Sequence, residues 1–152
     1  MRLSAHFSLE ELIASSTAQR LRLDNTPPAE ILPRLVQTAE MLERIRSTLA
    51  VPITVTSGYR APAVNGAVGG VTSSDHVQGQ AADIVAPMYG PPERIARTLG
   101  PLVSTLGSGQ LILEGVKGKQ WVHVSTRVPS NPANRIITIT DRGTVACIQA
   151  LL

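Results

Sequence analysis

The sequence is poor in cysteine and in aromatic residues. Its one cysteine, Cys147, cannot form an intramolecular disulfide, and there is no cysteine pair for a zinc ribbon. Aromatic residues make up only 3% of the 152 residues, so we expect a core of leucine, isoleucine, valine and alanine. Any metal ion bound by this chain must therefore be held by histidine and carboxylate side chains.

Long apolar runs are also missing. No stretch approaches the roughly 20 residues that a membrane-spanning helix needs. Residues 1–6 lack the apolar segment that is typical of a signal peptide. We therefore expect a protein that is made and kept in the cytoplasm and that does not bind membranes.

Charge of one sign is not concentrated anywhere. The net charge is +3, but the basic residues are scattered along the chain, which argues against a nucleic-acid-binding protein. A weakly cationic surface is compatible with an anionic substrate such as a cell wall. The length, with 43% hydrophobic and 16% charged residues, predicts one globular domain over residues 1–152, and we expect a monomer.

Helical patterns dominate the first part of the chain and strand patterns the second. The capping pattern at Ser8 predicts a short helix to about residue 14, apolar residues at three- and four-residue spacing predict a longer one from about Leu32, and Pro91 opens a third. Strands are predicted over residues 53–56, 81–85, 110–114, 120–125 and 135–140. This order favours an α+β fold with a small, mostly antiparallel sheet.

The stretch from Ser74 to Asp83 contains a histidine and a carboxylate that could converge. His76 and Asp83 are seven residues apart, and Gly79 with the small residues after it would allow a tight turn between a loop and a strand. On its own, such a pair is more often solvated or hydrogen-bonded for structural reasons than bound to a metal.

His123 lies in a second informative stretch, Trp121 to Ser125, which has the apolar character of a strand. A histidine in such a strand is costly unless its ring nitrogens find partners, and a core histidine bonded to backbone is the ordinary case. Together with His76 and Asp83, His123 would complete a zinc site of two histidines and one carboxylate. Such a site leaves a fourth position for water, as catalytic zinc sites do.

Five blocks of residues occur in a characteristic order. They are Ser57-Gly58-Tyr59-Arg60, Asn65, Val68-Gly69-Gly70, Ser74-x-His76-x-x-Gly79-x-Ala81-x-Asp83 and Trp121-Val122-His123-Val124-Ser125. Together they resemble the zinc D-Ala-D-Ala carboxypeptidase family, which includes D-alanyl-D-alanine carboxypeptidases, D,D-dipeptidases and phage L-alanyl-D-glutamate endopeptidases. The resemblance covers essentially the whole chain and implies the hedgehog/DD-peptidase fold.

The resemblance also implies a role for each candidate residue. His76, Asp83 and His123 would bind one zinc ion and make its water a nucleophile. Arg60 matches a family arginine that binds substrate and steadies a carbonyl oxygen or terminal carboxylate, and its planar guanidinium suits such recognition. Ser74 matches a family serine near the bound peptide, although its hydroxyl could equally cap a turn.

The chain departs from the family at Gln120. Many members have a catalytic glutamate or aspartate at this position, three residues before the second histidine, and a glutamine cannot accept a proton. A two-residue turn at Lys117–Gly118 would pair Glu114 with Trp121. Strand alternation would then place Glu114 on the face of His123. We therefore predict that Glu114 is the general base, with a solvated hairpin carboxylate as the alternative.

These features predict a zinc peptidase that cleaves the stem peptide of peptidoglycan. The cleaved bond would be L-Ala-D-Glu, as in a phage endolysin, or D-Ala-D-Ala, as in a carboxypeptidase. Such an endolysin would reach the wall after release from the cytoplasm of an infected host. A non-catalytic, zinc-braced phage structural or wall-binding domain is the alternative, and Gln120 leaves it open.

Overall fold

One six-stranded sheet forms the centre of the fold. The computed structural model describes residues 1–151, and the strand order is β1-β2-β4-β3-β5-β6. The strands are β1 (Thr54–Ser57), β2 (Ala81–Val85), β3 (Gln110–Val116), β4 (Lys119–Ser125), β5 (Ile136–Thr140) and β6 (Gly143–Ala146). Neighbouring strands are antiparallel except β3 and β5, which are parallel. The predicted α+β class and mostly antiparallel sheet are confirmed.

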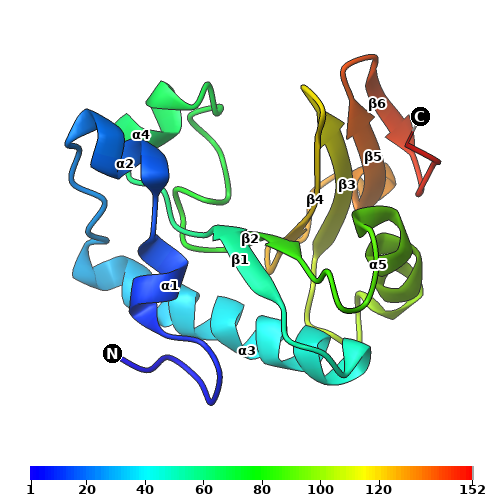
Figure 1. The fold of residues 1–152 in the computed structure, drawn as a ribbon, viewed down its shortest axis with the longest axis horizontal. Helices are drawn as coiled ribbons and strands as arrows, with labels where there is room; N and C mark the ends of the chain where they lie inside the picture. The colour runs from blue at the N-terminus through cyan, green and yellow to red at the C-terminus, as the bar shows by residue number, and fades with distance from the viewer. Residues whose placement is uncertain (152) are drawn as a thin grey trace.

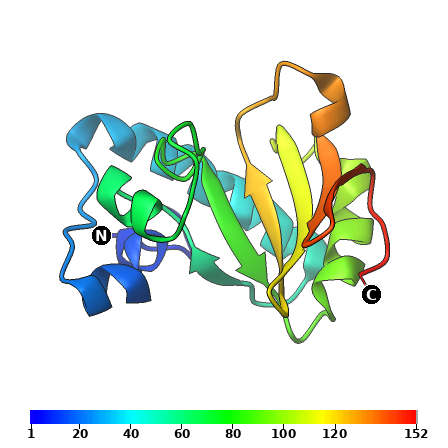
Figure 2. The same ribbon diagram turned by 90° about the horizontal axis from the view of Figure 1, so that it is seen from above.

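The helices lie at both ends of the sheet and across one face. In Figures 1 and 2, α1 (Leu9–Ile13), α2 (Ser16–Leu21) and α4 (Pro62–Ala67) gather beside β1, and α3 (Leu32–Leu49) crosses beneath β1 and β2. At the other end, α5 (Pro92–Leu99) packs against β3 and β4. Short 3-10 turns occur at Ala29–Ile31, Gly100–Leu102 and Pro132–Asn134. No helix within residues 1–151 combines the length and apolar character that crossing a membrane requires.

Local signals explain where two of the helices begin. The Ser8 hydroxyl accepts a hydrogen bond from the Glu11 N–H at 3.2 Å, so α1 begins where the capping pattern predicted it. Helix α3 begins at Leu32 because Pro33 is tolerated only in a first turn. Two short helices, α2 and α4, were not predicted.

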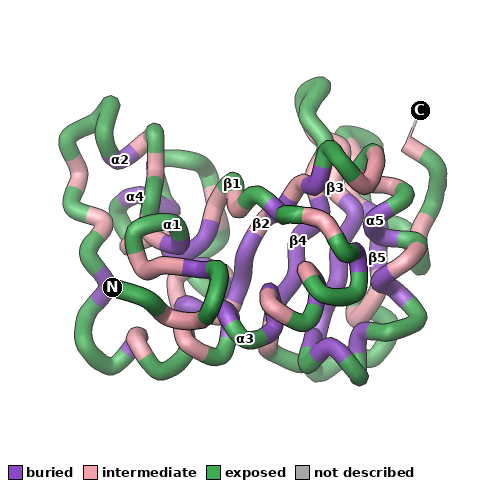
Figure 3. Tube along the Cα trace, turned by 60° about the horizontal axis from the view of Figure 1, so that its bottom comes forward, coloured by how far each residue is buried: buried purple, intermediate pink, exposed green. Residues whose placement is uncertain are grey.

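Alternate residues of β2, β3 and β4 bury one face of the sheet. The six residues on this face belong to a single apolar cluster with side chains of α3 and α5, and are Ala82, Ile84, Leu111, Leu113, Val122 and Val124. Figure 3 shows buried residues along these strands and α3. Aliphatic side chains dominate the cluster, as the composition predicted. The opposite face of the same strands carries Asp83, Glu114 and His123, together with Ile112 and Trp121.

The hairpin between β3 and β4 has the predicted register. Lys117 and Gly118 have φ values of 53° and 75°, which a two-residue turn of this hand requires at both positions. Glu114 therefore pairs with Trp121, and Ile112 with His123. Because side chains alternate along a strand, Glu114 and His123 lie on the same face of the sheet.

Candidate active site

Three ligand-type side chains converge on the free face of the sheet. Asp83 of β2 and His123 of β4 are cross-strand partners, and His76 reaches them from the preceding loop. Oδ1 of Asp83 lies 3.1 Å from Nδ1 of His123 and 3.3 Å from Nε2 of His76. The ligand atoms of all three residues lie within 4.8 Å of one another, so the group could hold a metal ion.

The donor set and its spacing fit zinc. Ligand atoms about 2.0–2.1 Å from a tetrahedral ion are about 3.3 Å apart, close to the separations from Asp83 Oδ1. Nδ1 of His76 is 2.7 Å from the carbonyl oxygen of Gly58. If this ring nitrogen donates to that oxygen, the ring presents Nε2 to the metal position, as ligating histidines usually do. Two imidazoles and one carboxylate are also typical of catalytic zinc.

The loop that carries His76 is a series of tight turns fixed by its neighbours. Gly79 has φ +70°, and a Cβ there would lie 2.6 Å from Ile31 Cγ2, so only glycine fits. Thr38 of α3 donates to the Gly79 carbonyl at 2.7 Å. The Ser74 hydroxyl accepts the His76 N–H at 3.2 Å, which is the turn-capping contact expected as the alternative for this serine.

Asp75 is held away from the metal position. Its buried carboxylate accepts hydrogen bonds from Ser125 Oγ at 2.9 Å and from Arg127 Nε. The chain forms a series of turns around Asp75. The contact with Arg127 ties the loop to the end of β4, and no sequence motif had marked Arg127.

Charges within the group keep Asp83 ionised. Burial alone would raise its pKa, but the charges and hydrogen bonds of His76 and His123 lower it overall. Burial would lower the pKa of His123, but the hydrogen bond and charge of Asp83 raise it overall. Because a metal ion and protons compete for the same ring nitrogens, metal binding at this position should depend on pH.

Glu114 and Arg60 form the second part of the site. Burial, with the charge of Asp83, raises the pKa of Glu114 to about 7. Arg60 follows β1, and its backbone N–H donates to the His76 carbonyl at 3.2 Å. The pKa of Arg60 is lowered overall, because the effect of burial outweighs the opposite effect of the charges of Asp83 and Glu114. Within residues 1–151, Nε of Arg60 is buried and has no acceptor.

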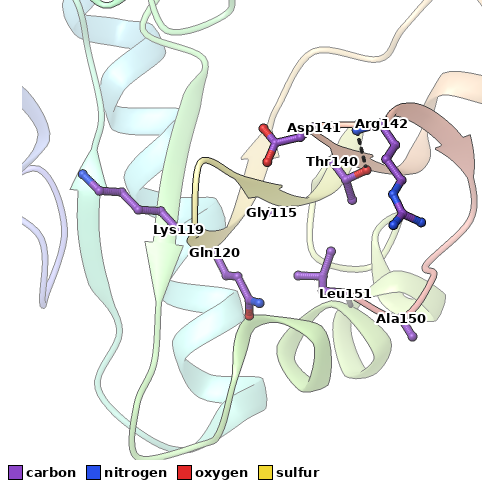
Figure 4. Close-up of a pocket in the computed structure, with 9 residues that line it drawn as sticks. Gly115, Lys119, Gln120, Thr140, Asp141, Arg142, Ala150 and Leu151 are labelled. Atoms are coloured by element: carbon purple, nitrogen blue, oxygen red, sulfur yellow. Dashed lines mark hydrogen bonds between the residues drawn. The ribbon is translucent and has the colours of Figure 1, made fainter.

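Gln120 lies on the other face of β4. It is exposed, and in Figure 4 its side chain leaves the strand towards Leu151 and α5, whereas Lys119 leaves it away from Leu151. In this regular hairpin, a residue three positions before His123 faces away from it. The position at which many family members have their acid is therefore not available to the site in this chain.

A cleft of about 320 Å³ opens beside Asp83. Its walls come from the α1–α2 segment, from β1 and the residues after it, and from the start of β4. The lining residues are Ala14, Ser15, Ser16, Thr17, Thr56, Ser57, Arg60, Val68, Asp83, Lys119 and Trp121. The cleft is thus bordered by hydroxyl groups and cations, which suits a polar peptide.

The comparison with protein families agrees with this geometry. The model of the family described as Peptidase M15 matches residues 5–125, which include every candidate site residue and exclude β5 and β6. No curated protein matches the chain. The sheet, the helices and the resemblance of the five motif blocks are all consistent with this match. The chain belongs to the Peptidase M15 family of metallopeptidases.

Proposed function

We propose that this chain is a zinc peptidase that cleaves the stem peptide of bacterial peptidoglycan. The observation that carries the proposal is the convergence of His76, Asp83 and His123 on the sheet face that also bears Glu114. Zinc held by these three ligands would supply a Lewis acid that activates water near neutral pH.

Glu114 is the proposed general base. Its carboxylate would accept the proton of the attacking water and deliver it to the leaving nitrogen of the peptide bond. A pKa near 7 suits a group that takes up and releases a proton at neutral pH. Asp75 is a poor candidate because its carboxylate is already bound to Ser125 and Arg127.

Arg60 and Ser74 are the proposed substrate-binding residues. Arg60 lines the cleft beside Asp83, and its buried Nε–H would find an acceptor in a carbonyl or carboxylate oxygen of the peptide. The Ser74 hydroxyl accepts the His76 N–H, and its own O–H can still donate to the peptide.

The substrate would be reached in one of two settings. In the endolysin-like setting, the chain accumulates in the cytoplasm of a phage-infected host, is released to the wall and cuts the L-Ala-D-Glu bond. In the carboxypeptidase setting, it cuts the terminal D-Ala-D-Ala bond. The same four groups, namely metal, base, arginine and serine, serve both reactions, since each hydrolyses an amide beside a carboxylate.

Digestion of purified sacculi, followed by mass spectrometry of the fragments, tests the proposal. We expect soluble fragments with one new amino terminus at a defined stem-peptide bond, loss of activity in excess EDTA, and recovery with added zinc. Full activity in EDTA would contradict the zinc mechanism. A folded, zinc-loaded protein that releases no fragments would instead support the non-catalytic, zinc-braced domain.

A further inference from the structure

The β4 wall of the cleft carries two residues that the proposed mechanism does not use. Lys119 and Trp121 both line the cleft, and they alternate with His123 on the same face of the strand. The opposite wall contributes mainly hydroxyl groups, including Ser16, Thr17 and Thr56. A polar ligand in the cleft would therefore meet Lys119 and an indole on the β4 side, and Arg60 on the β1 side.

Lys119 is a cation without a charged partner. Within residues 1–151 it forms no salt bridge, as is true of every lysine and arginine except Arg97 and Arg127. Its side chain leaves β4 on the side away from Leu151, as Figure 4 shows, and lines the cleft that Asp83 also lines. The ammonium group is thus free to bind an anion that enters the cleft.

Trp121 carries an unused donor at the same wall. Its indole Nε1 is buried and has no acceptor within the described residues. Burying an N–H without a partner is costly, so this donor calls for an acceptor from outside the chain, such as a water molecule or a ligand atom. Trp121 lies between Lys119 and His123 on this face, where a bound peptide would pass from the lysine to the metal ligands.

Strand geometry sets the position of the anion. Lys119 is four residues from His123, so their Cα atoms are about 13 Å apart along β4. A lysine side chain that leans along the cleft shortens this span by several ångströms. An extended peptide advances about 3.4 Å per residue, so the lysine faces a group two to three residues from the bond beside the metal ligands.

We propose that Lys119 and Trp121 form a second anion-binding position, which selects peptides with a carboxylate two to three residues from the cleaved bond. The inference rests on the proposed function, because it takes an acidic peptide as the occupant of the cleft. Arg60 would bind oxygen atoms next to the cleaved bond, and Lys119 would bind the carboxylate of a peptide residue two to three positions away. Specificity for an acidic stem peptide would then come from two separated cations.

Paired peptides test this position directly. A synthetic stem peptide is made once with free carboxylates and once with those groups amidated. Since Trp121 is the only tryptophan, its fluorescence in the zinc-loaded protein reports binding in the first phase of a stopped-flow trace, before turnover. We expect Lys119→Gln to weaken binding of the acid roughly tenfold, the size of one charge-assisted hydrogen bond, and to leave the amide unchanged.

Two further variants sharpen the result. Lys117→Gln removes the same charge from the turn of the same hairpin, outside the cleft lining, and should bind both peptides as the wild type does. Trp121→Phe keeps an aromatic ring without the N–H and, followed by calorimetry, should weaken binding of both peptides several-fold. Equal effects of Lys119→Gln and Lys117→Gln, or equal wild-type affinity for acid and amide, would overturn the proposal.

The outcome is separable from that of the proposed function. Lys119-dependent binding of the acid without digestion of sacculi would support the anion position and count against the peptidase. Digestion of sacculi with no dependence of binding on Lys119 would support the peptidase and overturn the anion position.

Discussion

On β2, β3 and β4, successive residues point alternately to the helices and to the cleft, and the two sets have different roles. The helix-facing set, such as Leu113 and Val122, is apolar, buried and packed against α3 and α5. The cleft-facing set includes Asp83, Glu114 and His123, whose charges shift one another's pKa values. Because the two sets share their backbone, changes on one face should alter unfolding, and changes on the other should alter metal binding and activity.

Loss of a metal ligand should give the largest effect. His76→Ala, Asp83→Ala and His123→Ala should each lower zinc occupancy and abolish wall cleavage, while the metal-free fold persists through the helix-facing core. Since zinc binds only the folded state, adding chelator should lower the melting temperature of the wild type but not of the variants. Atomic absorption and calorimetry measure both quantities. A fully zinc-loaded Asp83→Ala protein would contradict the ligand assignment.

The opposite face should respond in the opposite way. Leu113 is fully buried beside Val122, so Leu113→Ala should lower the free energy of unfolding by about 2–5 kcal/mol. At a temperature where the variant stays folded, its zinc content and its turnover per folded molecule should stay near those of the wild type. Denaturant unfolding and metal analysis test this. A stable variant that had lost its zinc would show that the faces are coupled.

Within the cleft-facing set, Glu114 should matter for the rate of cleavage and not for zinc binding. Glu114→Gln should retain zinc but lose roughly a hundredfold in the rate of sacculus digestion, the usual contribution of a positioned acid and base. Gln120→Ala, on the other face of β4, is the matched control and should cost far less. Wild-type rates for Glu114→Gln would mean that another group accepts the proton.

The sequence indicated the cleft-facing residues better than it indicated the architecture around them. The register of Glu114 against Trp121 could be predicted because positive φ at Lys117 and Gly118 follows from turn chemistry. Helices α2 and α4 escaped prediction because six residues are too short for a periodic signal. The contact of Asp75 with Arg127 joins residues 52 positions apart, and such long-range pairs leave no local pattern.

Arg60 offers a smaller and more selective change. Arg60→Lys keeps the charge but loses the planar fork and the Nε–H, so kcat/KM should fall roughly tenfold while zinc content and melting temperature persist. Steady-state kinetics on a soluble stem peptide separates kcat from KM. Unchanged kinetics would place Arg60 outside substrate binding.

The smallest expected effect concerns stability: it tests whether ionised Glu114 lowers the free energy of unfolding. In the metal-free protein its pKa is about 7, against 4.5 for an ordinary glutamate, so the folded state holds its proton more tightly than the unfolded state. Stability from this group is therefore fully present below about pH 4.5 and is lost as the pH rises through about 7. Above that pH, a partly buried carboxylate must be ionised beside Asp83, and Glu114→Gln removes this cost.

In the chelated protein, Glu114→Gln should therefore raise the free energy of unfolding above that of the wild type, and this gain should be about 1–2 kcal/mol larger at pH 8 than at pH 5. The gain corresponds to a few degrees in melting temperature. Added zinc should shrink the gain, because a dication favours the ionised carboxylate. Glu93→Gln is the control, since the Leu151 N–H and Arg97 lower the pKa of Glu93, so its stabilising charge is lost only at lower pH. That variant should differ from the wild type by the same amount at pH 5 and pH 8. If the gain for Glu114→Gln were also the same at both values, its carboxylate would not be titrating between them. Burial on the cleft-facing side of the sheet would then perturb the pKa of Glu114 less than its position indicates.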